Sequence, residues 1–430
     1  MKILTISDSP NLFSGLARVH RNVIDVLTEN GHQVLPCVWY GYDNETLQLI
    51  QAKKIKPPAI YYQSGDTPVQ MLTLYKRKRD SDVAALYEII KMAKPDVVCT
   101  IGDYWDFYYM QALKIKTDFS FKWLAYLTIE TDEINEKLKP LFRYADAIVV
   151  PTRYGKNVLE SETNKKIHLV PYGVGSAFGR KSDTDRKELR EERDCDDKIR
   201  FITVAQNTSR KSLPTLMQAV RIICHRDPDR KMQFYIHSNL DGLDAQESSL
   251  FDLRSIAKKL GVEDWFVFPE DCTSLFAAPS DESLSNEYNS ADFFITPSVC
   301  EGFGLPIVEA MACGLPVLAN AFSCMPDHLG PMAGDGQFGR AERGWAVANR
   351  TEIIPPDHII KVVKPDALAQ AIWEMVQLKK DENGRQILKT MSENCMRYAK
   401  EQTWGNTKRG LYQVFEEVAG PVSLPVEVIG

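Results

Sequence analysis

The residues with the clearest chemical potential lie within 298–319, in the segment SVCEGFGLPIVEAMACGLPVLA. Two glutamates, Glu301 and Glu309, stand eight positions apart around a glycine-bearing turn. A carboxylate repels phosphate but accepts hydrogen bonds from hydroxyl groups, as one does on a ribose in dinucleotide folds. Free N–H groups at the start of a helix attract phosphate. Together these features suit a ligand with hydroxyl groups at both ends and phosphate between them, such as a nucleoside diphosphate sugar.

The elements around this segment are predicted to be strand, loop, helix and strand. The apolar run 293–295 indicates one buried strand, and 315–319 indicates the next. Between them, Pro306 suits a first helical turn and Gly314 suits a helix C-cap. The glycine loop is therefore expected where a strand ends and a helix begins, which is where α/β sheets bind ligands. The alternative is a capped surface helix that carries two solvated glutamates.

The segment resembles the E-x7-E signature of the family-4 retaining glycosyltransferases, from Glu301-Gly302-Phe303-Gly304-Leu305-Pro306 through 309–317. The likeness follows the order of the family over nearly the whole chain. It implies the GT-B fold, with two Rossmann-like α/β domains whose parallel sheets face a cleft. It places an acceptor-side domain at residues 1–175 and a nucleotide-sugar-binding domain at 176–406. A C-terminal helix within 407–430 would cross back to the first domain.

A donor-binding loop is expected after the strand predicted at 201–205. In the family resembled, an arginine and a lysine of this loop grip the diphosphate, and Lys211 matches that lysine. Gln206 or Asn207 stands in place of the arginine, and Arg210 is the substitute that the sequence offers. Cations at this place stabilise the charge that a leaving nucleoside diphosphate gains. Without the resemblance, a solvated Arg-Lys pair is the simpler interpretation.

Strand ends in the first half supply the acceptor-side candidates. The strands predicted at 96–101 and 123–129 lead to Asp103 and Glu130, and the carboxyl ends of parallel strands share one edge. Glu130 stands where many members of the family have a histidine. Both carboxylates are candidates for orienting an acceptor hydroxyl, with helix capping as the alternative. In the first loop, Ser14-Gly15 replaces the usual pair of glycines, and Gly15 still permits close approach of the backbone to a phosphate.

These arguments give two sets of candidate residues. The catalytic candidates are Glu301, Glu130, Lys211 and Asp103, and the donor-binding candidates are Gly15, Arg210, Lys211, Phe303, Gly304, Leu305 and Glu309. The resemblance also implies that the strand ends at 239–242 and 269–271 hold the nucleobase, as they do in the family. The triplet Asp183-Thr184-Asp185 lies in a charged stretch, 179–198, interpreted as a linker, so neither a metal site nor a cofactor is predicted. Five glycines between 330 and 344 predict a mobile loop.

Composition agrees with a globular protein of two or more domains. The 430 residues are 44% hydrophobic and 26% charged, with a net charge of −6. The nine cysteines are scattered and form no C-x-x-C pair, which predicts a reduced, cytoplasmic protein. No apolar stretch of 18 residues occurs, so any membrane contact would be peripheral. Basic residues at Lys53, Lys54, Lys56 and 76–79 form either a solvated face or a contact for an anionic acceptor or membrane.

The function implied by the resemblance is the retaining transfer of a hexose. The donor would be a UDP- or GDP-hexose, and the acceptor a hydroxyl of a saccharide, a lipid-linked molecule or another compound. Two alternatives remain open at this point: an isomerase or phosphorylase on the same fold, and a sugar-nucleotide-binding protein without catalysis. The presence of Glu301, Glu309 and Lys211 together favours an active enzyme over a binding protein.

Overall fold

The computed structural model divides the chain into two compact units. Unit 1 comprises Met1–Tyr172 and Trp404–Gly430, and unit 2 comprises Gly173–Thr403. The structure describes residues 1–42, 46, 49, 50, 52, 54, 56–74, 80–238, 251–269, 280–354 and 358–420. The sequence predicted the two boundaries after residues 175 and 406, three residues later than the structure places each of them.

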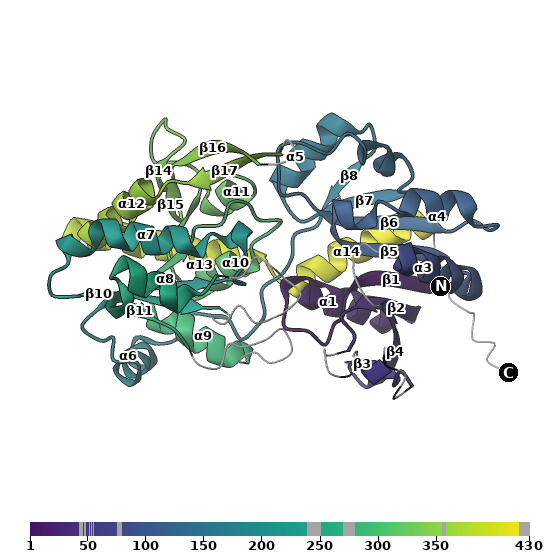
Figure 1. Cartoon of the computed structure of the whole chain (residues 1–430), viewed down its shortest axis with the longest axis horizontal. Coiled ribbons are helices and arrows are strands. Elements are labelled where there is room, and N and C mark those ends of the chain that lie inside the picture. The colour runs from purple at the N-terminus through teal and green to yellow at the C-terminus, as the bar shows by residue number, and fades with distance from the viewer. Residues whose placement is uncertain are drawn as a thin grey trace. The chain divides into compact units, whose positions relative to one another are not determined.

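In the described residues, unit 1 is built on a sheet ordered β3-β4-β2-β1-β5-β6-β7-β8 (Figure 1). Its strands are parallel except β3, which forms an antiparallel hairpin with β4 at one edge. The strands are β1 Lys2–Asp8, β2 Gln33–Trp39, β3 Ile60–Ser64, β4 Thr67–Leu74, β5 Val97–Asp103, β6 Lys122–Thr128, β7 Ala147–Val150 and β8 Ile167–Leu169. The helices are α1 Gly15–Glu29, α3 Asp80–Ala93, α4 Met110–Lys116, α5 Arg153–Glu162 and α14 Trp404–Ala419.

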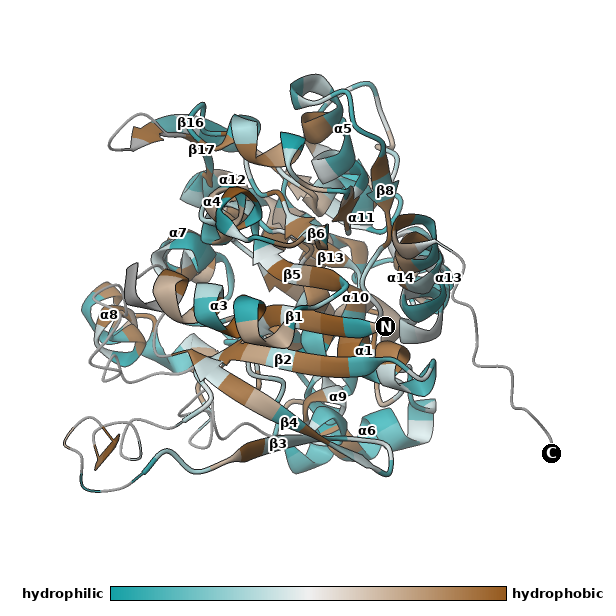
Figure 2. Cartoon of the chain, turned by 90° about the vertical axis from the view of Figure 1, so that its right-hand side faces the viewer, coloured by the Kyte–Doolittle hydropathy of each residue, from teal (hydrophilic) through white to brown (hydrophobic). Residues whose placement is uncertain are grey.

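The core of unit 1 lies along the central parallel strands. Figure 2 shows hydrophobic residues along most of β1, β2 and β5, as expected for strands covered by helices on both faces. Helix α14 packs against α1 and β6, where Thr407 Oγ1 donates a hydrogen bond of 2.7 Å to the Pro171 carbonyl. The returning helix predicted within 407–430 is thus confirmed for α14, and residues 421–430 lie outside the described part.

Unit 2 repeats the architecture, with its described strands in the order β11-β10-β9-β12-β13-β15-β14. All are parallel except the β14–β15 pair, and β16 and β17 form a separate antiparallel hairpin. The strands are β9 Ile199–Val204, β10 Met232–His237, β11 Phe266–Val267, β12 Phe293–Thr296, β13 Val317–Asn320, β14 Gly339–Ala341, β15 Gly344–Val347, β16 Asn349–Ile354 and β17 His358–Val363. The helices are α6 Asp183–Glu192, α7 Leu213–Ile223, α8 Leu253–Leu260, α9 Asp281–Ser290, α10 Leu305–Ala312, α11 Met325–Leu329, α12 Pro365–Leu378 and α13 Glu382–Glu401. The prediction of two α/β domains with parallel sheets is confirmed.

Two segments differ from the sequence-based expectation. The charged stretch 179–198 is not a linker, because it contains α6, whose N-cap Ser182 accepts a hydrogen bond from the Asp185 N–H. This helix is anchored to unit 2 through Arg190, whose Nη1 donates to the Ser290 carbonyl at 2.7 Å. The glycines of 330–344 were expected in a mobile loop, but part of that stretch forms β14 and the start of β15. Gly344 serves close packing, since a Cβ there would lie 1.9 Å from the Val317 carbonyl oxygen.

Several predicted features fall wholly or partly outside the described residues. These are the nucleobase-binding strand ends at 239–242 and 270–271, together with Lys53 and the basic run 76–79. In the described part of the chain, eight cysteines are free and buried, and no helix has the length and apolar character needed to cross a bilayer.

A buried histidine links α1 to the first strand of unit 1. His20 Nδ1 lies 2.8 Å from the Asp8 carbonyl oxygen, and His20 Nε2 lies 2.8 Å from Thr5 Oγ1. Because a carbonyl only accepts, Nδ1 carries the proton and Nε2 accepts from the threonine hydroxyl. Burial lowers the pKa of His20 to about 4, although the hydrogen bond to Asp8 opposes that shift.

The lowered pKa of His20 predicts a loss of stability in mild acid. An unfolded histidine takes up its proton near pH 6.5, whereas His20 in the folded protein takes it up only near pH 4. The free energy of unfolding should therefore fall as the pH drops through this window, by about 2 kcal/mol between pH 7 and pH 5 for this residue. Urea unfolding of the parent and of His20→Gln at both pH values measures the difference. Equal pH slopes for the two proteins would contradict the assignment.

Candidate functional site

The candidate site of unit 2 is built from two loops at one edge of its sheet. Strands β9 and β12 are parallel neighbours, so the loops that follow them leave the sheet at the same edge. The first loop ends in the 3-10 turn Ser209–Lys211 before α7, and the second runs from 297 to 304 before α10. The polar side chains predicted from these two separated stretches therefore lie side by side.

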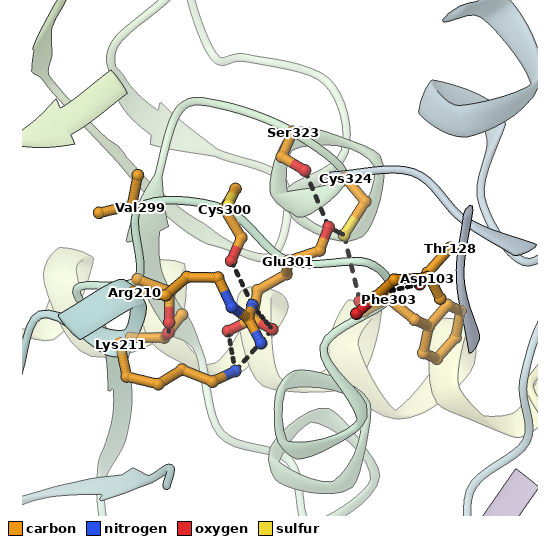
Figure 3. A network of polar contacts seen from close by, with 12 residues as sticks. Asp103, Thr128, Arg210, Lys211, Val299, Cys300, Glu301, Phe303, Ser323 and Cys324 are labelled. Carbon is orange, nitrogen blue, oxygen red and sulfur yellow. Dashed lines mark hydrogen bonds and ion pairs between the residues drawn. The ribbon is translucent and has the colours of Figure 1, made fainter. Parts of the chain in front are cut away.

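An ion pair between Lys211 and Glu301 joins the two loops (Figure 3). Lys211 Nζ lies 2.6 Å from Oε1 and 2.7 Å from Oε2 of Glu301. The side chains are 13% and 9% exposed, so solvent screens this pair much less than a surface pair. Burial alone would raise the pKa of Glu301, but Lys211, Arg210 and a hydrogen bond from Ser298 lower it to about 2. Glu301 is consequently a carboxylate at neutral pH.

Arg210 ties the same loops together through its backbone and its side chain. Its carbonyl accepts a hydrogen bond of 2.8 Å from the Val299 N–H, and its Nη1 donates one of 2.7 Å to the Cys300 carbonyl. Nη1 also lies 3.3 Å from Glu301 Oε2. The Arg210 side chain is 38% exposed, so it can reach solvent as well as Glu301. The structure thus brings Arg210, Lys211 and Glu301 into one cluster, as the sequence suggested.

The glycine loop between Glu301 and α10 has the geometry of a helix start. Gly304 has a φ of +82°, and a Cβ there would lie 2.8 Å from Ile307 Cδ1, so both conformation and space favour glycine. Leu305 is the first residue of α10, and the buried Phe303 precedes Gly304. The N–H groups of the first turn of any α-helix have no partner within that helix. In α10 Pro306 has no N–H and the Ile307 N–H donates to the Gly304 carbonyl at 2.9 Å, so the Leu305 N–H is the donor of this turn that suits an anion.

Glu309 lies one turn into α10 and is only 3% exposed. Tyr288 Oη donates a hydrogen bond of 3.1 Å to Glu309 Oε2 from the neighbouring helix α9. Tyr288 in turn packs edge-on against Phe178, with ring centroids 5.9 Å apart. The carboxylate predicted to bind a ribose is therefore fixed in position by a buried tyrosine.

The acceptor-side candidates of unit 1 gather at the carboxyl ends of β5 and β6. Asp103 and Thr128 are register partners, and the Thr128 hydroxyl donates a hydrogen bond to Asp103 Oδ1 (Figure 3). Glu130, two residues beyond β6, is 6% exposed. Burial raises the pKa of Tyr104, and the negative charges of Asp103 and Glu130 add to this shift. Two carboxylates and a protonated phenol therefore lie close together, as expected for strand ends that share an edge.

Gly15 is the exposed first residue of α1, in unit 1. The preceding Ser14 caps this helix, because its hydroxyl accepts a hydrogen bond of 3.1 Å from the Ala17 N–H. Ser14 Oγ also donates to Asp8 Oδ2 at 3.3 Å, and Asp8 ends β1. The serine that replaces the usual glycine thus serves as an N-cap and leaves the Gly15 backbone accessible.

Sequence reasoning missed the residues that support the glycine loop from behind. Ser323, Cys324 and His328 all contact carbonyl oxygens of this loop. Asn320 Nδ2 donates to the carbonyls of Ser298 and Val299 at 3.1 and 3.0 Å. For Asn320, Ser323 and Cys324 the available signal was their place shortly after the strand predicted at 315–319, because polar residues after a parallel strand lie at the binding edge. In the described part of the chain, no group of three or more His, Cys, Asp or Glu residues could hold a metal ion.

Comparisons with known proteins agree with this architecture. Residues 185–338 match the family model described as Glycosyl transferases group 1. The chain is 27% identical over 185 residues to the mannosylfructose-phosphate synthase of Agrobacterium fabrum, covering 42% of this chain and 38% of that protein. It is 27% identical over 238 residues to a D-inositol 3-phosphate glycosyltransferase of Corynebacterium jeikeium, covering 54% and 55% of the two chains. The aligned parts thus span about half or less of the length of these relatives.

Solved structures match over nearly the full length. The sucrose-phosphate synthase of Thermosynechococcus elongatus aligns with a TM-score of 0.70 at 17% identity, over 97% of this chain and 99% of that one. Anabaena HepE in complex with UDP-glucose aligns with a TM-score of 0.65 at 14% identity, over 97% and 100%. At such identities the likeness concerns the fold. Residues 185–338 of this chain thus match the model of Glycosyl transferases group 1, and the chain has the two-domain GT-B fold of these solved structures.

Proposed function

We propose that this protein is a retaining glycosyltransferase of family 4 that transfers a hexose from a UDP- or GDP-hexose to an acceptor hydroxyl. The observation that carries the proposal is the largely buried Lys211–Glu301 pair beside the amino end of α10. It combines a cation for a diphosphate with a carboxylate for sugar hydroxyls in one place. The relatives support transfer from a nucleotide-sugar donor, since the curated ones are named as glycosyltransferases or sugar-phosphate synthases, and the HepE structure contains UDP-glucose.

Each group in unit 2 has a role in this proposal. Lys211, Arg210 and the Leu305 N–H at the start of α10 bind the diphosphate, and the N–H groups of Phe303 and Gly304 donate to the transferred sugar. Glu309 accepts hydrogen bonds from the ribose hydroxyls. Together with Glu301, it forms the E-x7-E pair.

In unit 1, Asp103 and Glu130 orient the acceptor hydroxyl. Gly15 lets the backbone approach the donor phosphate closely.

The proposed step keeps the configuration at the anomeric carbon. The bond between the anomeric carbon and the phosphate oxygen breaks, and the acceptor oxygen forms its bond on the same face. The departing phosphate takes the proton of the acceptor hydroxyl, so the products are the glycoside and the nucleoside diphosphate. Glu301 positions the far hydroxyls of the sugar and forms no covalent bond, because the Lys211 ammonium group donates hydrogen bonds to both oxygens of its carboxylate.

A panel of UDP-, GDP- and ADP-hexoses in thermal-shift assays tests the donor class. A ligand at 100 times its Kd should stabilise the protein by about 2.7 kcal/mol. With the donor identified, NMR of the glycoside formed on a simple saccharide should show the α configuration of the donor retained. An inverted β linkage would refute the retaining mechanism, and release of an isomerised sugar without transfer would favour the isomerase alternative.

Glu309→Gln should raise the KM for the donor and lower kcat/KM. Losing a charge-assisted hydrogen bond to the ribose costs about 1.5–3 kcal/mol, a roughly 10- to 100-fold decrease in kcat/KM. Tyr288→Phe is the matched control, because it removes the hydroxyl bonded to Glu309 and keeps the carboxylate. Steady-state kinetics with varied donor concentration measure both variants. An unchanged kcat/KM in Glu309→Gln would refute the ribose assignment.

Activity is expected to survive chelation by EDTA. In the proposal, Lys211, Arg210 and the helix N–H groups supply the positive charge that stabilises the leaving diphosphate. Initial rates before and after dialysis against EDTA measure the effect. A loss of activity that Mg²⁺ or Mn²⁺ restores would show that a metal shares this task.

A further inference from the structure

The glycine loop is held from the side of α11 by three side-chain donors. Ser323 Oγ donates a hydrogen bond of 2.8 Å to the Glu301 carbonyl, and Cys324 Sγ lies 3.2 Å from the Phe303 carbonyl oxygen. His328 Nε2, on α11, lies 2.6 Å from the same Phe303 oxygen. In Figure 3, Ser323 and Cys324 lie across the Glu301 backbone from Lys211. The backbone of the loop is thus fixed on one side and its carboxylate on the other.

His328 makes the shortest of these contacts, and its protonation state is defined by its partners. The Phe303 carbonyl only accepts, so Nε2 carries the proton, and Nδ1 accepts from Tyr398 Oη at 2.9 Å. Burial lowers the pKa of His328, which keeps the ring neutral at pH 7. The ring also meets Phe303 edge-on, with centroids 5.0 Å apart at 88°.

Arg343 fixes the other end of this arrangement. Its guanidinium carbon lies 4.4 Å from the centre of the Tyr398 ring, and its Nε donates to the His328 carbonyl at 2.5 Å. The chain of contacts therefore runs from Arg343 through Tyr398 and His328 to the peptide that joins Phe303 to Gly304. With an exposure of 1%, His328 is too deeply buried to touch a ligand itself.

The direction of a carbonyl determines the direction of the N–H in the same peptide. In a trans peptide the C=O and the following N–H point to opposite sides. Because Glu301 and Phe303 direct their carbonyls to Ser323 and His328, the N–H groups of Gly302 and Gly304 point away from these side chains. Two amide donors are thereby aimed to the side of the loop opposite α11.

We propose that His328 is a positioning residue, which holds the Phe303–Gly304 peptide so that the Gly304 N–H binds an oxygen of the transferred sugar. This inference rests on the proposed nucleotide-sugar donor. Lys211 and Arg210 carry the binding of the diphosphate, so His328 controls the affinity for the sugar part of the donor. His328 thus acts through the loop backbone, and Tyr398 selects the ring tautomer that can donate.

The test compares three variants of the full chain. His328→Leu removes the donor at similar volume, and His328→Gln keeps an amide donor near the position of Nε2. Leu329→Ala is a control for stability, because Leu329 is equally buried in α11 and its side chain has no polar atom. Calorimetry measures the Kd for the intact nucleotide sugar and for the free nucleoside diphosphate, and thermal melting measures the stability of each variant.

His328→Leu should weaken binding of the intact nucleotide sugar about 10-fold or more, with less than a 2-fold change for the free diphosphate. His328→Gln should recover most of the affinity, and Leu329→Ala should lower the melting temperature without this selective loss. The proposal is overturned if His328→Leu weakens both ligands equally, or if Leu329→Ala reproduces its selectivity.

A crystal structure of ligand-free His328→Leu separates this proposal from the proposed function. It should show the Phe303 carbonyl rotated from its direction in the parent protein. If the carbonyl keeps its direction, His328 does not position the peptide, whatever the protein binds. If the carbonyl rotates but the parent binds no nucleotide sugar, the positioning holds and the proposed function fails.

Discussion

Lys211→Ala is expected to destabilise the protein by about 3 kcal/mol at pH 7, because it leaves a buried carboxylate without its main partner. Glu301 is 9% exposed, and Arg210 would remain beside it at 3.3 Å. The ionised Glu301 contributes to the free energy of unfolding above its unfolded pKa of 4.5, and this contribution is lost as the pH falls through its folded pKa of about 2. The difference in stability between parent and variant should therefore narrow as the pH falls below 4.5. Urea unfolding across this range measures it.

The same variant should lose affinity for the nucleoside diphosphate by roughly 10- to 100-fold, the value of one charge-assisted hydrogen bond. Lys379→Ala is the matched control in unit 2, because Lys379 also pairs with a largely buried carboxylate, that of Asp292. Lys379→Ala should lower the free energy of unfolding and leave the affinity for the nucleoside diphosphate unchanged. If calorimetry finds the diphosphate bound to Lys211→Ala as tightly as to the parent, Lys211 serves the fold alone.

The parallel strands and the order of the two units could be predicted from the sequence because their signals are local. The runs that became β5, β6, β9 and β12 are mainly apolar, and each ends close to polar residues. A parallel sheet brings such ends to one edge, so the rule that joined Glu301 to Lys211 needed no contact information. The pairing of Asp103 with Thr128 follows from the same geometry once the register is known.

Features that depend on tertiary contacts were not predictable in this way. Helix α6 was interpreted as part of a linker because the stretch 179–198 is dense in charge and poor in apolar residues. In the structure none of the α6 residues is buried, so the helix has no apolar face to detect. His328 lies on a five-residue helix, too short to show any periodicity. Its importance comes from the Phe303 carbonyl, 25 residues earlier in the chain, and from Tyr398, 70 residues later. No local pattern in the sequence carries either contact.

Glu301→Gln is expected to affect the diphosphate and the intact donor in opposite ways. The carboxylate of Glu301 and the phosphates of the donor compete for the same cations, Lys211 and Arg210. Removing the negative charge should therefore leave the nucleoside diphosphate bound at least as tightly as in the parent. Transfer should nevertheless fall roughly 100-fold in kcat/KM, because the sugar hydroxyls lose a charge-assisted partner. The result distinguishes two roles for Glu301. If its carboxylate only weakened phosphate binding through its negative charge, its removal would raise kcat/KM, whereas the loss of a carboxylate that positions the sugar lowers kcat/KM.

Glu287→Gln is the control for the loss of a largely buried ion pair in unit 2. Glu287 pairs with Arg193 at 2.7 Å and with Arg200 at 3.0 Å, so its replacement should lower stability without changing either ligand affinity.

Mass spectrometry of the parent with donor alone completes the test. A nucleophilic carboxylate would accumulate a glycosyl adduct, whereas a carboxylate held by Lys211 on both oxygens is expected to form none. A trapped adduct on Glu301 or Glu130 would overturn the single-step retaining mechanism and leave only the donor-binding role of this cluster.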